Sequence, residues 1–266
     1  MTDRVTVTVE DDVARLTLAH PELRNALTAD LAGELVAAME QVADTDARCV
    51  VLAAEGSTFC AGGDVNAMVA GVEQWNSGEW DREDARAAIE RTASAVTAVA
   101  RCELPTVAAL QGSAYGAGAA LAIACDVVFA SDEAAISFAF RRLGLAVDSG
   151  TSSLLPRIVG ESTAKELVFT GETVEAERAA DLGLFNRVVA ADSFEAELDG
   201  FVEEIASGPT AALSASKRLL EQAHQRSLSE AVDAETEAQL AALETADHAE
   251  GVRAFVEGRV PEFQGD

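Results

Sequence analysis

The chain has 266 residues, with 19 basic against 46 acidic side chains and a formal net charge of -27. A length of this order supports one large domain, or a core with an appendage, around a substantial hydrophobic core. The negative charge argues against nucleic acids and anionic membranes as partners, because their phosphates would be repelled. No apolar run reaches the roughly 20 residues of a membrane span, and the N-terminus lacks a secretory pattern, so we expect a cytoplasmic protein.

The acidic residues are scattered, and only two lysines, Lys165 and Lys217, accompany the arginines. Such a surface resembles that of proteins from salt-loving archaea, in which salt screens the self-repulsion. The four cysteines stand at 49, 60, 102 and 125. None forms a CxxC pair, so we expect reduced, mostly buried thiols rather than a disulfide framework, and no metal site.

Alternating apolar residues predict two strands, at 5–10 and 13–18, joined by a hairpin turn at residues 10–12. A helix is expected to begin after Thr28 as its N-cap. The apolar stripe of this helix consists of Leu31, Leu35, Met39 and Val42. A continuous apolar run at 49–54 then predicts a buried strand.

Residues 70–82 contain Trp75 and Trp80, and we expect a looser insertion whose tryptophans line an acyl pocket or simply pack. The elements expected next are a helix at 83–101, a strand at 106–112, a helix of small residues at 116–124, and strands at 126–130 and 185–190. Alternating strands and helices predict an α/β core over residues 1–205. A helical region follows at 206–266, with Pro209 near a helix start.

Two glycine-bearing loops follow predicted buried strands: AGGD at 61–64 and GSAYGAG at 112–118. Glycine lets a ligand approach the backbone, and N–H groups at a helix start are unpaired, so such loops suit an oxyanion. Taken alone, the glycines are better explained by plain turn geometry and close helix packing. GAGAAL at 116–121 lacks the third glycine of GxGxxG and lies deep in the chain, which argues against a nicotinamide cofactor. No GxSxG motif of a serine hydrolase occurs.

Five longer motifs occur in the order PELRNAL, FCAGGDVNAM, VAALQGSAYGAGAALAIACDVVFAS, LGLAVDSGTSSLLPRIVG and AFVEGRVPEF. Together they resemble the enoyl-CoA hydratase/isomerase (crotonase) superfamily, from about Val5 to Phe263. The resemblance implies an α/β fold, a crotonase-like spiral of ββα units with a C-terminal helical region that builds a homotrimer or a homohexamer. It also implies an acyl-CoA substrate, with coenzyme A as part of that substrate and no separate cofactor.

In this superfamily two backbone N–H groups form an oxyanion hole, and the resemblance places them on Gly63 and Gly116. The residues that it places against the substrate are Arg24, Ala26, Ala61, Gly62, Asp64, Ala120, Phe140 and Phe255. Arg24 is a candidate phosphate contact, against the alternative of an ordinary surface arginine. We expect Asp64 to cap the helix that begins after it rather than to act in the chemistry.

The chain departs from a hydratase at the two positions where familiar hydratases carry glutamates, here Ala120 and Phe140. Adding water to a double bond needs groups that activate the water and deliver a proton, and neither side chain can do so. The acid that remains in this segment is Asp148, whose alternative role is the N-cap of the following helix. Enoyl-CoA isomerases carry an acid there, so the resemblance favours an isomerase with Asp148 as its acid and base, in a dry pocket.

Other functions stay open. A hydratase would need a displaced acid such as Glu79 or Asp81, and a hydrolase or dehalogenase would use Asp148 as its nucleophile. A non-catalytic CoA-binding scaffold is the alternative outside enzymes. Hydratases often carry a phosphate-binding lysine where this chain has Gly258, and Arg253 or Arg259 is the candidate replacement. We expect surface or capping roles for His20, His224 and His248.

Overall fold

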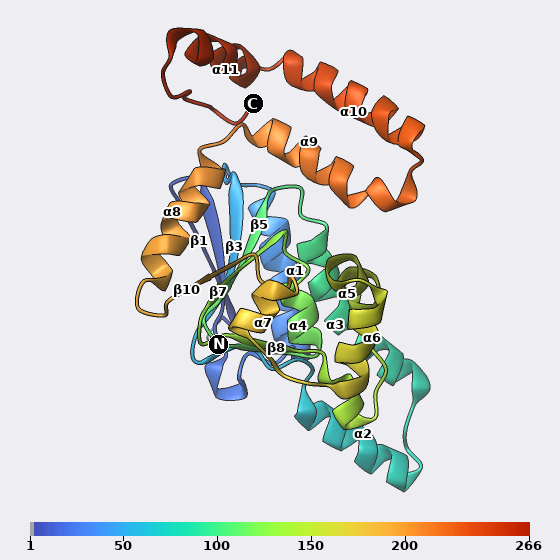
Figure 1. Cartoon of the computed structure of the whole chain (residues 1–266). Helices are drawn as coiled ribbons and strands as arrows, with labels where there is room; N and C mark the ends of the chain where they lie inside the picture. Colours follow the sequence, from blue (N-terminus) through green and yellow to red (C-terminus); the bar gives the residue numbers. More distant parts are fainter. Residues whose placement is uncertain (1–2) are drawn as a thin grey trace.

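The computed structural model describes residues 3–266, in which two β-sheets are surrounded by helices (Figure 1). Strands β1 (Val5–Glu10) and β2 (Val13–Leu18) pair antiparallel, which confirms the predicted hairpin. Asp11 and Asp12 both have positive φ, of 48° and 63°. Two such residues give a turn whose twist matches that of the flanking strands.

The larger sheet has six strands in the order β1-β2-β3-β5-β7-β10, and every pair after the hairpin is parallel. The strands added to the hairpin are β3 (Cys49–Ala54), β5 (Thr106–Leu110), β7 (Val127–Ser131) and β10 (Arg187–Val189). In β3, Val50 and Leu52 belong to the main core, while Cys49 and Val51 pack in a second cluster with α8 (Phe194–Ala206). Burial on both faces explains why the apolar run predicted here is continuous rather than alternating.

The smaller sheet gives the fold its repeat. It consists of β4 (Thr58–Cys60), β6 (Ser113–Tyr115), β8 (Ala135–Ser137) and β9 (Val174–Glu175), in that order. After each of β3, β5 and β7 the chain adds the next strand to this smaller sheet and then forms one or more helices. Three successive ββα units result, which confirms the predicted spiral.

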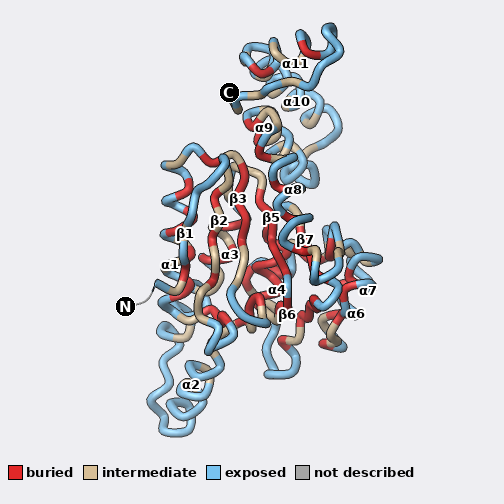
Figure 2. The backbone as a smooth tube through the Cα atoms, turned by 90° about the vertical axis from the view of Figure 1, so that its left-hand side faces the viewer, coloured by how far each residue is buried: buried red, intermediate tan, exposed pale blue. Residues whose placement is uncertain are grey.

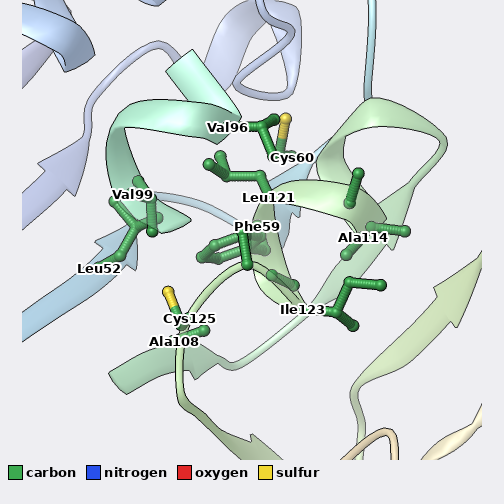
Figure 3. Packing of buried hydrophobic residues seen from close by; sticks show 14 of the residues in the cluster. Leu52, Phe59, Cys60, Val96, Val99, Ala108, Ala114, Leu121, Ile123 and Cys125 are labelled. Atoms are coloured by element: carbon green, nitrogen blue, oxygen red, sulfur yellow. The ribbon is translucent and has the colours of Figure 1, made fainter. Parts of the chain in front are cut away.

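The helices of the core begin with α1 (Ala29–Val42), which Thr28 caps by accepting the Leu31 N–H at 3.2 Å. The others are α2 (Val65–Ser77), α3 (Arg82–Ala100), α4 (Ala117–Ala122), α5 (Thr151–Val159), α6 (Glu161–Thr170), α7 (Ala176–Asp181) and α8, with 3₁₀ turns η1 (Pro21–Leu23) and η2 (Ala139–Leu143). Every residue of α4 is buried. Figure 3 shows Leu121 of α4 among Phe59, Cys60 and Val96, so strand and helix side chains hold α4 at the centre of the core.

The prediction of a looser insertion at residues 70–82 is wrong. Residues 65–77 form α2, which ends at Gly78 with a φ of 77°, and Asp81 then caps α3. The prediction failed because α2 buries none of its residues, so it lacks the buried apolar stripe by which a core helix is recognised. Figure 2 shows the exposed segment around α2 projecting from the core. Trp75 of α2 and Trp80, in the turn before α3, are both exposed and pack edge to face with their ring centroids 5.5 Å apart.

At the C-terminus α9 (Thr210–Glu221), η3 (Ala223–Gln225), α10 (Leu228–Leu243) and α11 (Ala246–Glu257) extend from one end of the core (Figure 1). The predicted division after residue 205 falls in the last turn of α8. Lys217 of α9 fastens this region to the core through Asp126 at 2.7 Å and the Leu104 carbonyl at 3.0 Å. Among the helices described, none has the length and apolar character that crossing a membrane requires.

Candidate functional site

Asn25 joins the segment before α1 to the first glycine loop. Its side chain is fully buried and donates to the carbonyls of Glu55 at 2.9 Å and Thr58 at 2.8 Å, while its oxygen accepts the His20 N–H. The Ala61 N–H donates to the Arg24 carbonyl at 3.0 Å, so the two segments lie side by side. The sequence analysis missed Asn25, although a polar residue inside the quoted motif PELRNAL was the available signal.

The glycines of the two loops are required by close packing. A methyl group on Gly112 would lie 2.1 Å from the Ser57 carbonyl oxygen, and one on Gly118 would lie 2.3 Å from that of Cys60. A methyl group on Gly62 would lie 2.6 Å from the carbonyl oxygen of Tyr115. Backbone cannot move aside as a side chain can, so only glycine lets the two loops meet.

The prediction that Gly116 supplies the second oxyanion donor is wrong. Its N–H donates to the Ser137 carbonyl at 2.9 Å and is therefore already used. Gly116, with φ 53° and ψ -118°, turns the chain so that Ala117 begins α4. The N–H of Ala117 has no acceptor within residues 3–266, as expected for the first residue of a helix. The Ala117 nitrogen lies 3.5 Å from the position that a methyl group added to Gly62 would occupy, which places this N–H beside the first loop.

Gly63 supplies the other free donor, since its N–H likewise has no acceptor in the part of the chain that the structure describes. The neighbouring Gly62 carbonyl accepts the Leu27 N–H at 2.8 Å, which fixes this peptide against the segment before α1. Free N–H groups of Gly63 and Ala117 thus stand on two loops in direct contact. Two such donors suit an oxygen that gains negative charge during a reaction.

Asp148 does not cap the helix that follows it. The N-cap of α5 is Gly150, with no side-chain hydrogen bond, and Asp148 contributes only its main-chain oxygen, which accepts the Thr151 N–H at 2.9 Å. The Asp148 Oδ1 is enclosed and has no hydrogen-bond partner among residues 3–266. Burial raises the pKa of the Asp148 carboxyl, and the nearby Ser149 hydroxyl lowers that pKa by a smaller amount. A half-buried carboxyl with a raised pKa is equipped to accept and return a proton.

The positions that replace the hydratase glutamates lie close to the second loop. Phe140 of η2 is buried, and its ring lies 4.0 Å from the position of a methyl group on Gly116. Ala120 of α4 is fully buried, so it presents no surface to a ligand, and the structure does not support its predicted substrate contact. α5, which begins three residues after Asp148, packs against α4.

Of the remaining residues predicted to contact the substrate, all except Phe255 lie on the two adjoining segments before α1 and before α2. Arg24 is exposed beside the AGGD loop and forms no ion pair within the described chain, while Ala26, Ala61 and Gly62 belong to the same two adjoining segments. Asp64 accepts the Asn66 N–H at 2.9 Å, which confirms its capping role in α2.

Phe255 is not brought to the glycine loops. It lies on α11, 87% exposed, at the opposite end of the molecule from α2 (Figure 1), so its predicted substrate contact is wrong within a single chain. The candidate replacements for the missing lysine lie in the same region and are already paired. Arg253 contacts Glu250 at 3.3 Å, and Arg259 forms ion pairs with Glu250 and Glu257.

The acids considered for a hydratase lie on the exposed turn between α2 and α3. Asp81 accepts the N–H groups of Glu83 and Asp84, and Glu79 accepts the Ser77 hydroxyl at 3.3 Å. Asp81 thus has a capping role, and neither acid is buried as Asp148 partly is. Two shallow surface grooves lie over α3 and α10, and no residue of the glycine loops lines either of them.

Comparison with known proteins agrees with this geometry. The model of the enoyl-CoA hydratase/isomerase family matches residues 8–266. A probable enoyl-CoA hydratase of Rhodobacter capsulatus is 37% identical over 257 residues, covering 97% of this chain and 96% of the relative. The 1,2-epoxyphenylacetyl-CoA isomerase of Escherichia coli is 33% identical over 259 residues, covering 97% of each. The crystal structure of an enoyl-CoA hydratase from Bacillus anthracis superposes with a TM-score of 0.91 at 28% identity, over 99% of this chain and all of the other.

Proposed function

Since the chain belongs to the enoyl-CoA hydratase/isomerase family, we propose that it moves the double bond of an enoyl-CoA, with Asp148 as acid and base. The observation that carries this proposal is the Asp148 carboxyl, half-buried, free of any capping role and raised in pKa. The names of the relatives include both hydratases and an isomerase, so the choice depends on the acids of this chain. Ala120 and Phe140 leave it without the pair of acids that hydration uses.

The N–H groups of Gly63 and Ala117 bind the thioester oxygen and stabilise the enolate that forms when a C2 proton leaves. Removing one donor of such a hole costs about 3 kcal/mol of transition-state stabilisation in comparable enzymes. Both donors belong to the main chain and are held by loops that pack on each other. They therefore need no rearrangement as the negative charge develops.

Asp148 takes a proton from C2 of a 3-enoyl-CoA, and the electron pair spreads through the enolate and the adjacent double bond. The same carboxyl then returns the proton at C4, which gives the 2-enoyl-CoA without net gain or loss of protons. Its raised pKa makes the carboxylate a stronger base and allows its acid form to persist long enough to return the proton. The buried Phe140 ring beside Gly116 helps to exclude the water that would favour hydration.

Coenzyme A, as part of the substrate, lies in this proposal along the adjoining segments 24–27 and 61–64, with the exposed Arg24 near a phosphate. A homotrimer or homohexamer accounts for the apolar side chains that the single chain leaves in water. Such side chains on α10 and α11 include Leu228, Phe255 and Val256. In an assembly of this kind α11 would contact another subunit.

The decisive experiment compares purified protein on 3-enoyl-CoA and 2-enoyl-CoA of equal chain length. We expect isomerisation of the first, little hydration of the second, and a loss of isomerisation of about 10²- to 10⁴-fold in Asp148→Asn. Hydration that persists in Asp148→Asn would contradict the proposal and would favour a hydratase that uses Glu79 or Asp81 as its acid. A covalent acyl intermediate on Asp148 would indicate a hydrolase or dehalogenase instead.

A further inference from the structure

Helix α2 carries a stripe of apolar side chains that the single chain leaves in water. Val65, Met68, Val72 and Trp75 follow one another at intervals of three, four and three residues, which places them on one face of the helix. Val65, Val72 and Trp75 are 55%, 61% and 67% exposed. Trp80 extends this face, because its ring packs on that of Trp75. We call these five residues the α2 stripe.

The α2 stripe is uncharged in a chain that is otherwise strongly acidic. Residues 65–72 contain no Asp, Glu, Lys or Arg, although the chain has 46 acidic residues and α2 buries none of its own. A helix as exposed as α2 in Figure 2 is expected to carry charged side chains on its outer faces. Exposed apolar side chains gathered on one face indicate that an apolar ligand or partner covers them.

The α2 stripe reaches the loop that carries the Gly63 donor. The Met68 Cε lies 2.8 Å from the position that a methyl group added to Gly63 would occupy. An acyl chain whose thioester oxygen binds at Gly63 therefore starts beside an apolar side chain of the stripe. From Met68 to Trp75 the stripe runs for about 10 Å along the helix, the length of about eight carbons of an extended alkyl chain. This continuity with the candidate site favours the substrate over an unrelated partner as the ligand of the stripe.

We propose that the α2 stripe binds the alkyl part of the substrate, so that the preferred substrates are long-chain acyl-CoA thioesters of about twelve carbons or more. This inference rests on the proposed function, which places the thioester at Gly63. A short acyl chain ends near Met68 and leaves Val72 and the two tryptophans in water. A long chain covers these side chains and is itself removed from water, and both changes stabilise the complex.

The test uses saturated ligands that cannot isomerise, namely butanoyl-CoA and dodecanoyl-CoA, the latter below the concentration at which it forms micelles. Titration calorimetry measures both dissociation constants, and we expect dodecanoyl-CoA to bind about 100-fold more tightly. Tryptophan fluorescence reports on the stripe directly, because Trp75 and Trp80 are the only tryptophans of the chain and both belong to it. Dodecanoyl-CoA should shift their emission to shorter wavelength, whereas butanoyl-CoA should leave it unchanged.

Val72→Asp places a charge in the middle of the α2 stripe. Because Val72 is exposed, this change spares the fold, and we expect the preference for dodecanoyl-CoA to fall to about fivefold or less, since the alkyl chain would cover the charge. Ala70→Asp is the matched control. Ala70 is also exposed but lies on the opposite face of α2, so this variant should keep the preference. Thermal unfolding of both variants verifies that the fold is retained.

Equal binding of the two ligands by the unmodified protein would overturn the inference, and so would a preference that survives in Val72→Asp. If the stripe instead joins two copies of the chain, Val72→Asp lowers the mass measured by light scattering and leaves the preference unchanged, which would overturn the inference too. Because these ligands do not react, none of the results depends on whether a 3-enoyl-CoA is isomerised, which tests the proposed function separately.

Discussion

The two sides of the candidate site, the loops that carry the N–H donors and the turn that carries Asp148, differ in what fixes their backbone. On the donor side, the loops that carry Gly63 and Ala117 pack backbone against backbone, with glycines where any side chain would collide. On the acid side, Ser149 and Gly150 have positive φ values, and the Asp148 Oδ1 is enclosed without a hydrogen-bond partner among residues 3–266. The two donors of the proposed oxyanion hole are therefore fixed by contacts between backbone atoms. The carboxyl on the acid side stands instead on a turn with positive φ values, which backbone hydrogen bonds hold in place.

The largest expected effect tests the donor side directly. Ala117→Pro removes one N–H at the first position of α4, where proline is well accepted because that N–H has no partner within the helix. We expect kcat for isomerisation to fall by about 10²- to 10³-fold with the fold retained. Steady-state kinetics with a thermal unfolding control measure this, and an unchanged kcat would exclude Ala117 as a donor.

The second effect tests how tightly the loops are packed. Gly118→Ala places a methyl group 2.3 Å from the Cys60 carbonyl oxygen, so we expect a loss of about 3 kcal/mol or more in the free energy of unfolding. Gly33→Ala, in α1, is the matched control, because nothing lies within 4 Å of the new methyl group. That control should gain about 1 kcal/mol, and denaturant unfolding of both variants measures the contrast. Equal stabilities would show that the loops can move apart.

The smallest effect concerns stability on the acid side. Because the pKa of Asp148 is raised above its ordinary value of 3.8, the folded chain holds this proton more tightly than the unfolded chain does. Ionisation therefore lowers stability as pH rises from about 3.8 through the raised pKa, and the penalty is complete above it. Asp148→Asn does not titrate, so it should be more stable than the unmodified protein at neutral pH, with no difference below pH 3.8. A neutral-pH melting temperature below that of the unmodified protein would contradict this.

Helices and strands with a regular pattern of buried apolar residues could be predicted from the sequence. Details that depend on how distant strands pair, or on how a turn bends, could not. The hairpin and α1 follow from periodicity, β3 follows from its continuous apolar run, and the family follows from the order of the motifs. The choice of Gly116 failed because the use of its N–H by Ser137 depends on how β6 and β8 pair, which no local pattern reveals. The sequence also left an N-cap role open for Asp148 as the alternative to catalysis, and only the structure shows that the chain turns through Ser149 and Gly150 so that Gly150 is the N-cap. The salt dependence suggested by the acidic composition stays a prediction.

The link between Lys217 and Asp126 has a consequence for how the molecule behaves across ionic strengths. The Lys217 side chain is 8% exposed, and Asp126 also accepts the N–H and hydroxyl of Thr106, at the start of β5. Salt screens buried charges far less than the exposed pairs that cover the rest of this acidic chain. Because Lys217 is nearly enclosed while Asp126 is 29% exposed, added salt weakens this pair less than it weakens the fully exposed surface pairs. The attachment of α9 to the core therefore depends less on the salt concentration than those pairs do.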